Sequence, residues 1–542
     1  MASVLDSAVS LKSNEGVEEV CVNVRRLTEL YLSKQYDAVC TELLEAIEKV
    51  KNAKLLLSKT FCKTQLTQFM QCFLYMFVQQ DFIIPDQLNM QFIGKNMTIA
   101  NLMVHTPMQN TDRELRILLD QHENNLVKVL ALYSARNTIT MDTRALFNAN
   151  AHFASAWYYS YAIIYQIGMM RQDIVDRLNR HFAYRDDRLI PMDGINDAFF
   201  GCTYADPHRD RDCKEFLNRQ TRTWIKSNAQ TYEKIAMESN IRPSALTWNE
   251  PNEPQKDAIS IVGPCTRTYN PTDRIKVAVI SDLWFKEHSV YRNYAAYVRA
   301  MYQQRDRFEL TLFYTSTPLE RLDITTFDHV HLLRTNEPET IRPLLQGGFH
   351  IIYYPDIGMT NHSIILSNLR LAPIQICSPG HSVSTWGSKI DYFITGKDVE
   401  PANASQQCYS EQVVLLPGYG VIHNRPLYER KVPLPKTEIP TISPRPDNIV
   451  VVNCPWSGHK IHARLIRIVK RILSAVDENI TVHLHIFPQA SGTQFGGFMP
   501  FIYDIHNQIL GIEETDEREV REAKQSKFRH KVDISCGLNY QD

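Results

Sequence analysis

Apolar residues recur at intervals of three or four along the first part of the chain, from about residue 16 to residue 235. This spacing places apolar side chains on one face of an α-helix. It is clear in YDAVCTELLEAIEKV, TQLTQFMQCFLYMFV and DIVDRLNRHF. The pattern predicts an all-α region of paired amphipathic helices. It shows no regular period of about 34 residues, so it does not indicate a tetratricopeptide array.

The pattern changes after residue 273, where short runs of β-branched and aromatic residues replace the helical spacing. The runs are IKVAVIS, FELTLFYT, HIIYYP, PIQIC, DYFIT and VVLLP, and helical stretches such as HSVYRNYAAYVRAMYQQ separate some of them. Strands that alternate with helices predict a parallel sheet with helices on its faces. A second unit of this kind begins at IVVVNC and continues through HARLIRIVKRILSAV and TVHLHIFP.

Two stretches rich in proline and polar residues, 241–273 and 431–448, interrupt these patterns. Such composition is typical of connections between domains. We therefore predict an α plus α/β protein: an all-helical domain over 1–240, a first Rossmann-like lobe over 274–430 and a second over 449–542. Two lobes of this type form a cleft, and ligands of such sheets bind at the carboxyl ends of the strands.

The composition bears on whether the chain binds nucleic acid or metal ions. Lys and Arg number 59 against 60 Asp and Glu, for a net charge of -1, so the chain has no overall basic field for nucleic acid. The 11 cysteines are scattered and form no CxxC pair or metal-binding spacing, which predicts free thiols in a reducing compartment and no metal site.

Nothing in the apolar pattern predicts export or a membrane span. The first residues, MASVLDSAVSLKSNEG, lack a basic stretch followed by an apolar one. The most apolar segment, 151–170, contains His152, Gln166 and several tyrosines, so a buried helix is favoured over a membrane span. We expect a soluble cytoplasmic protein.

Three segments that follow predicted strands carry candidate chemistry. In VVNCPWSGHKIHARL, Ser457, Gly458 and Lys460 follow a strand and are expected to open a helix. The free N–H groups of a first helical turn attract phosphate oxygens, and a lysine adds a positive charge. The alternative is that Ser457 only caps the helix and Lys460 is solvated.

The second segment is SDLWFKEHSVYRN, in which His288 and Arg292 lie one helical turn apart after the strand IKVAVIS. A histidine there is able to move a proton or to form a hydrogen bond with a ligand. A plain helix cap is the alternative for His288.

The third segment is SPGHSVSTWGS, between PIQIC and DYFIT. Gly380 allows the backbone to turn, and His381, Ser382, Ser384 and Thr385 offer polar groups just past a strand end. Convergent groups of this kind bind sugars. A Pro-Gly turn with solvated hydroxyls explains the same residues equally well.

Together, YYPDIGMTNHS, SNLRLAPIQIC, the following Gly-His, IDYFIT, EHSVYR and CYSEQVVLLPG resemble the bacterial cytoplasmic N-glucosyltransferases of high-molecular-weight adhesin systems, relatives of the O-GlcNAc transferases. The resemblance spans about residues 190–510. It implies a helical domain followed by a GT-B pair of lobes. It also implies an inverting, metal-independent transfer of a hexose from UDP-glucose or a related UDP-sugar to Asn in Asn-x-Ser/Thr sequences of an adhesin.

The resemblance also implies roles for individual residues. Lys460 resembles the lysine that neutralises the UDP diphosphate, with Ser457 and Gly458 beside it, and Gln489 in HIFPQASG falls near the donor. His288 falls in the segment that faces the acceptor and the reacting sugar. Gly380 and His381 fall in the loop beside the donor, so we expect that loop to be a ligand-binding surface.

The chain departs from the family pattern in two places. Ser382 and Trp386 stand where the family loop has a proline and a second histidine, so the preferred sugar is expected to differ or activity to be impaired. The segment after residue 511 is polar and charge-rich, without the Gly-rich donor segment of the family. We therefore expect an incomplete second lobe with a polar tail. The alternative function is an inactive homologue that acts as an adhesin-binding or partner-binding scaffold.

Overall fold

The computed structural model describes residues 9–11, 20–52, 63–238 except 105, 122–124, 165–167 and 207, 273–423 except 334–337, and 448–534 except 455, 457–459, 487–503 and 514–515. The chain divides into two compact units. Unit 1 comprises Met1–Arg188 and Arg430–Asp542, and unit 2 comprises Leu189–Glu429. Both predicted connections, 241–273 and 431–448, lie almost wholly outside the described residues.

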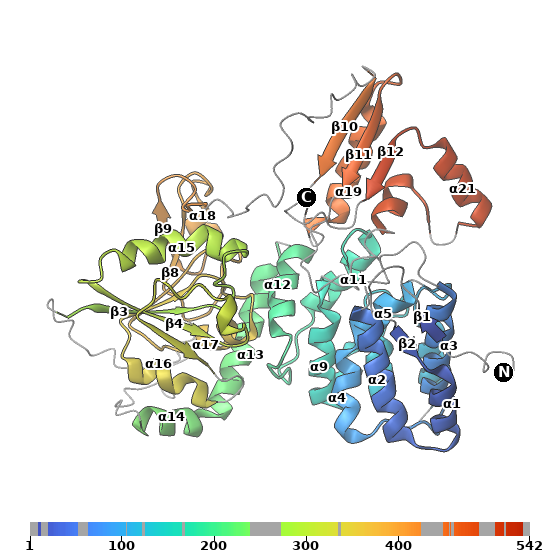
Figure 1. The fold of residues 1–542 in the computed structure, drawn as a ribbon, viewed down its shortest axis with the longest axis horizontal. Helices are drawn as coiled ribbons and strands as arrows, with labels where there is room; N and C mark the ends of the chain where they lie inside the picture. The colour runs from blue at the N-terminus through green and yellow to red at the C-terminus, as the bar shows by residue number, and fades with distance from the viewer. Residues whose placement is uncertain are drawn as a thin grey trace. The chain divides into compact units, whose positions relative to one another are not determined.

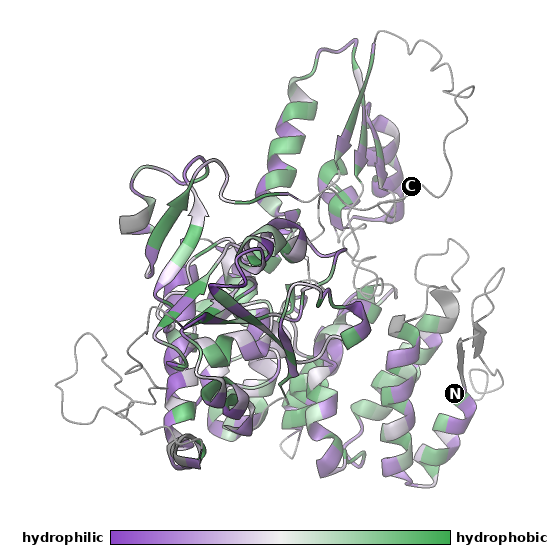
Figure 2. Cartoon of the chain, turned by 60° about the vertical axis from the view of Figure 1, so that its left-hand side comes forward, coloured by the Kyte–Doolittle hydropathy of each residue, from purple (hydrophilic) through white to green (hydrophobic). Residues whose placement is uncertain are grey.

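The N-terminal part of unit 1 is helical, as its apolar spacing predicted. A short hairpin of β1 (Val9–Leu11) and β2 (Val20–Val22) precedes the helices. Bands of hydrophobic and hydrophilic residues alternate along the helices (Figure 2). The helices are α1 (Val24–Leu32), α2 (Tyr36–Asn52), α3 (Lys63–Phe77), α4 (Asn89–Gly94), α5 (Asn96–Val104), α6 (Asp112–Asp120), α7 (Leu126–Leu132), α8 (Thr143–Ala149), α9 (Ala151–Tyr161) and α11 (Gln172–Ala183) (Figure 1).

The first part of the apolar segment at 151–170 forms the short helix α9, which is packed inside this helical region. Trp157, Tyr158 and Tyr161 are buried, and the Trp157 indole N–H donates to the Tyr133 carbonyl at 2.9 Å. In the described part of the chain, no helix combines the length and apolar character needed to cross a bilayer.

The C-terminal part of unit 1 is the second α/β lobe. Its sheet has the order β10 (Ile449–Cys454), β11 (Thr481–Ile486) and β12 (Lys531–Ile534), with both pairs parallel. Helix α19 (Ala463–Ala475) packs Ile466, Val469 and Leu473 into the core beside the strands, and α21 (Arg518–Lys527) buries no side chain.

Strand β12 corrects the expectation of a polar tail. The segment reads KVDI within a charge-rich stretch, so sequence alone indicated no strand. Its pairing with β11 sets Val532 opposite Leu484, and Val532 packs against the core of the lobe. The neighbouring strand therefore supplies the backbone hydrogen bonds that this polar segment needs to become a strand.

Unit 2 contains a seven-stranded parallel sheet in the order β5-β4-β3-β6-β7-β8-β9. Strands β3, β4, β8 and β9 of this sheet are labelled in Figure 1. The chain starts at β3 in the middle, runs outward to β5, and returns to β6 on the other side of β3. The strands are β3 (Ile275–Ile280), β4 (Phe308–Tyr314), β5 (His329–Leu332), β6 (Ile351–Tyr354), β7 (Ile374–Cys377), β8 (Tyr392–Gly396) and β9 (Gln412–Leu416).

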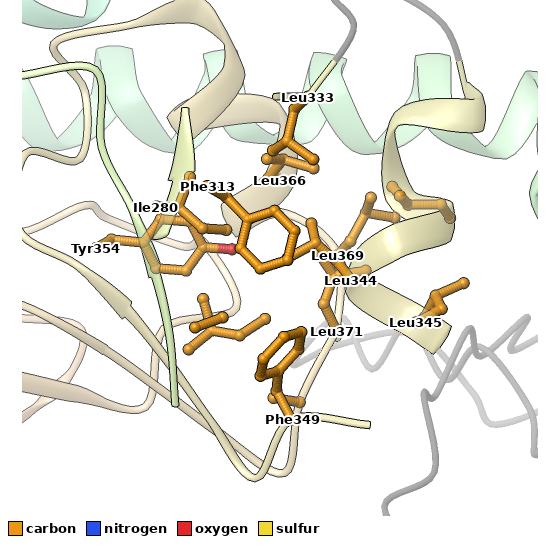
Figure 3. Close-up of a cluster of buried hydrophobic side chains, with 14 of the residues drawn as sticks. Ile280, Phe313, Leu333, Leu344, Leu345, Phe349, Tyr354, Leu366, Leu369 and Leu371 are labelled. Atoms are coloured by element: carbon orange, nitrogen blue, oxygen red, sulfur yellow. The ribbon is translucent and has the colours of Figure 1, made fainter. Parts of the chain in front are cut away.

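This strand order makes a topological switch point between β3 and β6. In open parallel sheets, ligands bind at such a point, outside the carboxyl ends of the strands. The helices of the sheet region are α15 (Ser289–Tyr302), α16 (Arg342–Gly347), α17 (Asn361–Ser367) and α18 (Ala404–Gln407). Apolar side chains from several of these strands and helices form one buried core (Figure 3).

Three helices that precede the sheet in sequence also belong to unit 2: α12 (Ile195–Ala205), α13 (Asp210–Ser227) and α14 (Ala229–Glu238). Tyr232 and Ile235 of α14 join the core under the sheet. The predicted helical domain over 1–240 included these three helices, because helical spacing does not identify which surface a helix packs against.

Candidate functional site

The carboxyl ends of β3 and β6 carry a cluster of polar side chains at the switch point. Ser281 and Asp282 directly follow β3, and Asp356 lies two residues after β6. The Ser281 hydroxyl donates to Asp356 Oδ2 at 2.9 Å, which ties the two strand ends together. Asp282 accepts from the backbone N–H of Thr315, after β4, at 2.6 Å. Three neighbouring strands thus end in one hydrogen-bonded network.

Asp356 is the most perturbed carboxyl group of this network. The residue is only 1% exposed, and its Oδ1 has no hydrogen-bond partner within the described part of the chain. Burial raises the pKa of the Asp356 carboxyl to about 7, and the negative charge of Asp282 adds to that effect, while the Ser281 hydroxyl opposes it. A carboxyl group with this proton affinity is able to take up or release a proton near neutral pH.

His362 lies on the same edge, in the first turn of α17 behind its cap Thr360. Its Nε2 atom has no hydrogen-bond partner among the residues that the structure describes. Burial lowers the pKa of the His362 imidazole, and the carboxylates of Asp282 and Asp193 oppose that effect. His362 is therefore predominantly neutral at pH 7 and close enough to Asp282 to sense its charge.

Gly380 holds the loop after β7 against the loop after β6. A Cβ atom at Gly380 would lie 2.2 Å from the Pro355 carbonyl oxygen and 2.8 Å from the Asp356 Cα. Only glycine allows this approach without displacing backbone. Gly380 therefore affects the switch-point cluster through packing, in addition to the backbone turn predicted from its sequence.

His381 follows Gly380 in the loop after β7, and its side chain is buried, with 4% of the residue's surface exposed. Its Nε2 atom lies 3.1 Å from Lys214 Nζ on α13 and 3.3 Å from Thr203 Oγ1 on α12. Burial and the positive charge of Lys214 lower the pKa of the His381 imidazole well below its usual value. The ring is therefore neutral, and one of its two nitrogens is already occupied by protein.

The hydroxyl groups that follow His381 point into the protein. The Ser384 hydroxyl donates to Glu411 Oε2 at 2.7 Å, and the Thr385 backbone N–H donates to Glu411 Oε1 at 2.8 Å. From the other side, Asn218 Nδ2 donates to the carbonyl groups of Thr385 and Trp386, both at 2.8 Å. The Thr385 hydroxyl also donates to Glu411 Oε1. The expectation that Ser384 and Thr385 present hydroxyls to a ligand is wrong, because the buried Glu411 carboxylate accepts from both hydroxyls. Ser382 remains exposed.

His288 is the N-cap of α15, which was the alternative reading of its sequence. Its Nδ1 atom accepts a hydrogen bond from the Val290 backbone N–H at 3.1 Å. Burial lowers the pKa of the His288 imidazole to about 4, and the charges of Arg292 and Arg321 add to the effect. The neutral ring therefore carries its proton on Nε2 and offers a donor there rather than a base.

The predicted diphosphate-binding residues belong to the second lobe in unit 1. Lys460 is exposed and lies before α19, whose first residue is Ala463. His462 caps this helix by accepting from the Arg464 N–H at 3.1 Å. The cap of α19 therefore lies two residues past Lys460, so Lys460 is not in the first turn of this helix. Ser457, Gly458 and Gln489 fall outside the described residues.

Sequence reasoning did not single out Asp356, His362 or Lys214. Asp356 stood inside the quoted segment YYPDIGMTNHS, directly after a predicted strand. Its position at a strand end was a usable signal. Its burial beside Asp282 depends on β3 and β6 being neighbours, and no local pattern reveals that pairing.

Comparison with known proteins relates the chain to protein glycosyltransferases. No protein-family model matches it. The UDP-glucose:protein N-beta-glucosyltransferase of Actinobacillus pleuropneumoniae serotype 5b (strain L20) is 24% identical over 327 residues, which cover 58% of this chain and 47% of that protein. The same-named protein of serotype 7 (strain AP76) is 23% identical over 327 residues, with the same coverage. The chain spans about half the length of these curated relatives.

A solved structure was also found. A point mutant of the Thermobaculum terrenum O-GlcNAc transferase is similar with a TM-score of 0.46 and 13% sequence identity, over 96% of this chain and 75% of that one. The sequence matches confirm the predicted resemblance: this chain is similar in sequence to two UDP-glucose:protein N-beta-glucosyltransferases.

Proposed function

We propose that this protein is an inverting glycosyltransferase that moves a hexose from a UDP-sugar to asparagine side chains of a protein acceptor. The observation that carries the proposal is the sequence match over 327 residues to two UDP-glucose:protein N-beta-glucosyltransferases. The polar cluster at the switch point of the first sheet supports it, since parallel sheets bind ligands at that place.

In this reaction, the bond between the anomeric carbon and the β-phosphate oxygen breaks, and UDP leaves with the electron pair. The acceptor amide nitrogen attacks from the opposite face, forms the new bond to carbon and loses one proton. Negative charge develops on the departing diphosphate, where positive charge stabilises the transition state most strongly. Lys460 is exposed on the second lobe and would supply that charge in a metal-independent reaction, as the family resemblance implies.

We assign the remaining donor contacts to Ser457, Gly458 and Gln489, as the family resemblance implies. Gly380 would shape the wall of the site through its contact with Pro355 and Asp356. The nucleotide-sugar is the only small molecule that this scheme needs, and no cofactor enters it. The acceptor would be an adhesin with Asn-x-Ser/Thr sequences, modified in the cytoplasm.

The polar groups of the first sheet divide into donors and one candidate acceptor of the amide proton. His288 Nδ1 accepts from Val290, and His381 Nε2 is occupied by Lys214, so both rings offer only an N–H group. Asp356 keeps Oδ1 without a partner in the described structure, and its pKa of about 7 suits proton transfer at neutral pH. We therefore assign hydrogen-bond donation to His288 and His381, and proton acceptance to Asp356 through one bridging water, because this carboxyl is only 1% exposed.

The test is transfer from radiolabelled UDP-glucose and UDP-galactose to peptides that contain Asn-Ala-Thr, with matched Gln-Ala-Thr peptides as the control. Label on the Asn peptide and release of UDP are expected. The variant Lys460→Ala should reduce transfer at least about tenfold, the loss expected for one charged contact. Lys470→Ala, which removes another exposed lysine of the same lobe, should not.

Absence of both transfer and UDP release with each sugar would overturn the proposal. Calorimetric titration with UDP then decides the alternative. Binding heat without transfer would indicate an inactive nucleotide-binding homologue, and no heat at all would indicate a scaffold that binds protein partners only.

A further inference from the structure

A buried ammonium group lies behind the loop that follows β7. Lys214 of α13 is 0% exposed. Its Nζ atom lies 3.5 Å from Asp210 Oδ2, 3.4 Å from the Ser384 carbonyl oxygen and 3.1 Å from His381 Nε2. Lysine rarely lies so deep in a protein unless its charge has partners. These three contacts therefore need a physical explanation.

The chemistry of the three contacts determines where the protons are. The Asp210 carboxylate and the Ser384 carbonyl are able only to accept, so Lys214 donates to both. An ammonium group has three N–H donors and no acceptor, so its third contact, His381 Nε2, must accept as well. A neutral imidazole that accepts at Nε2 carries its proton at Nδ1. The described residues provide no hydrogen-bond partner for that Nδ1–H group.

The surroundings favour this arrangement. The Phe199 ring lies 5.0 Å from Lys214 Nζ, and the Phe200 ring packs 4.8 Å from the His381 ring, centroid to centroid. Burial lowers the pKa of Lys214, whereas the neighbouring Cys202 and Asp210 side chains oppose that effect. The titratable groups that influence Lys214 are those two and Cys213 on α13.

We propose that Lys214 is a positioning residue that acts through His381, keeping its imidazole neutral with the proton on Nδ1, so that the ring donates one permanent hydrogen bond to an oxygen of the sugar nucleotide. This rests on the proposed function for the identity of the ligand. The tautomer itself rests only on the contacts of Lys214. A fixed donor of this kind does not change with pH, unlike an ordinary histidine, whose charge changes near pH 6.5.

Nitrogen NMR of ¹⁵N-histidine-labelled protein tests the tautomer directly, with His381→Gln used to assign the signal. In the unmodified protein, the His381 signal should be that of a neutral ring protonated at Nδ1, unchanged from pH 5 to 8. Lys214→Met removes the donor to Nε2 and leaves the Asp210 carboxylate without its ammonium partner. The ring should then take up a proton at Nε2, and its signal should titrate within that range. A titrating ring in the unmodified protein would overturn the proposal.

Lys214→Met leaves a buried carboxylate without its counterion, which destabilises a core. The double variant Lys214→Met with Asp210→Asn removes both charges and keeps the volume, so it preserves the test if the single variant does not fold. Its His381 ring should lose the fixed Nδ1 tautomer. An unchanged His381 signal in this double variant would overturn the proposal. Lys226→Met, at an exposed position of α13, serves as the control.

Kinetics provide a second readout. Lys214→Met should lower kcat/KM for the UDP-sugar by about tenfold to a hundredfold, the cost of a lost hydrogen bond to a charged group, and should add a pH dependence with the His381 pKa. Lys214→Arg, which keeps the charge, should restore much of the pH-independent behaviour. If the unmodified protein shows neither transfer nor UDP binding, the proposed function fails, while the NMR measurement still decides whether Lys214 fixes the tautomer.

Discussion

The stability of Asp356→Asn, measured relative to that of the unmodified protein, should be higher at pH 8 than at pH 5. Burial raises the pKa of the Asp356 carboxyl to about 7, from about 3.8 in an exposed aspartate. The folded protein therefore holds this proton more tightly than the unfolded chain does. Between these two pKa values, the free energy of unfolding falls as pH rises, and it is constant below and above them.

The size of the effect follows from the two pKa values. Because the carboxyl ionises more readily in the unfolded chain, it lowers the free energy of unfolding by about 2 kcal/mol at pH 5 and about 4 kcal/mol at pH 8. The difference, about 2 to 3 kcal/mol, is absent from Asp356→Asn, because an amide does not ionise. Loss of the Ser281 hydrogen bond to Oδ2 shifts the stability of the variant equally at both pH values, so it does not enter the difference.

Urea denaturation of the unmodified protein and of Asp356→Asn at pH 5 and pH 8 measures this quantity, provided that the m value is unchanged. Asp398→Asn, which removes an exposed carboxylate from the same unit, controls for the general effect of charge removal. A stability difference between Asp356→Asn and the unmodified protein that is the same at both pH values would refute the reasoning, since it would mean that the carboxyl is hydrated.

Three further substitutions test the local architecture. Gly380→Ala should destabilise the protein by about 1 to 3 kcal/mol in thermal melts, because its Cβ would meet the Pro355 carbonyl oxygen at 2.2 Å; an unchanged melting temperature would contradict this packing. His288→Ala should lose about 1 kcal/mol with its helix cap, whereas His288→Asn should retain most of that stability. Equal melting of the two variants would count against the cap. Glu411→Ala should cost about 3 kcal/mol, because it leaves buried donors of the β7 loop without an acceptor; limited proteolysis of this loop should rise in parallel, and an unaltered digestion pattern would argue otherwise.

The positions of most strands were readable from the sequence because buried parallel strands are continuous apolar runs. IKVAVIS, FELTLFYT and TVHLHIFP became β3, β4 and β11. The β1–β2 hairpin was not predicted, and in the two parallel sheets strands β5 and β12 were missed. Strand β5 reads HVHL and is largely exposed at the edge of its sheet, and β12 lies in a charge-rich stretch. Both depend on the strand beside them, so local composition carries little of their signal.

The sequence by itself also placed polar candidates at strand ends, including His288, Gly380 and His381, because a strand followed by glycine or polar residues is a local pattern. What each residue does was decided by distant partners. His381 meets Lys214, which lies 167 residues earlier, and Ser281 meets Asp356 across 75 residues. Burial and charge set proton affinity, and both arise only when the chain packs, so tertiary structure alone decided which groups hold protons at this site.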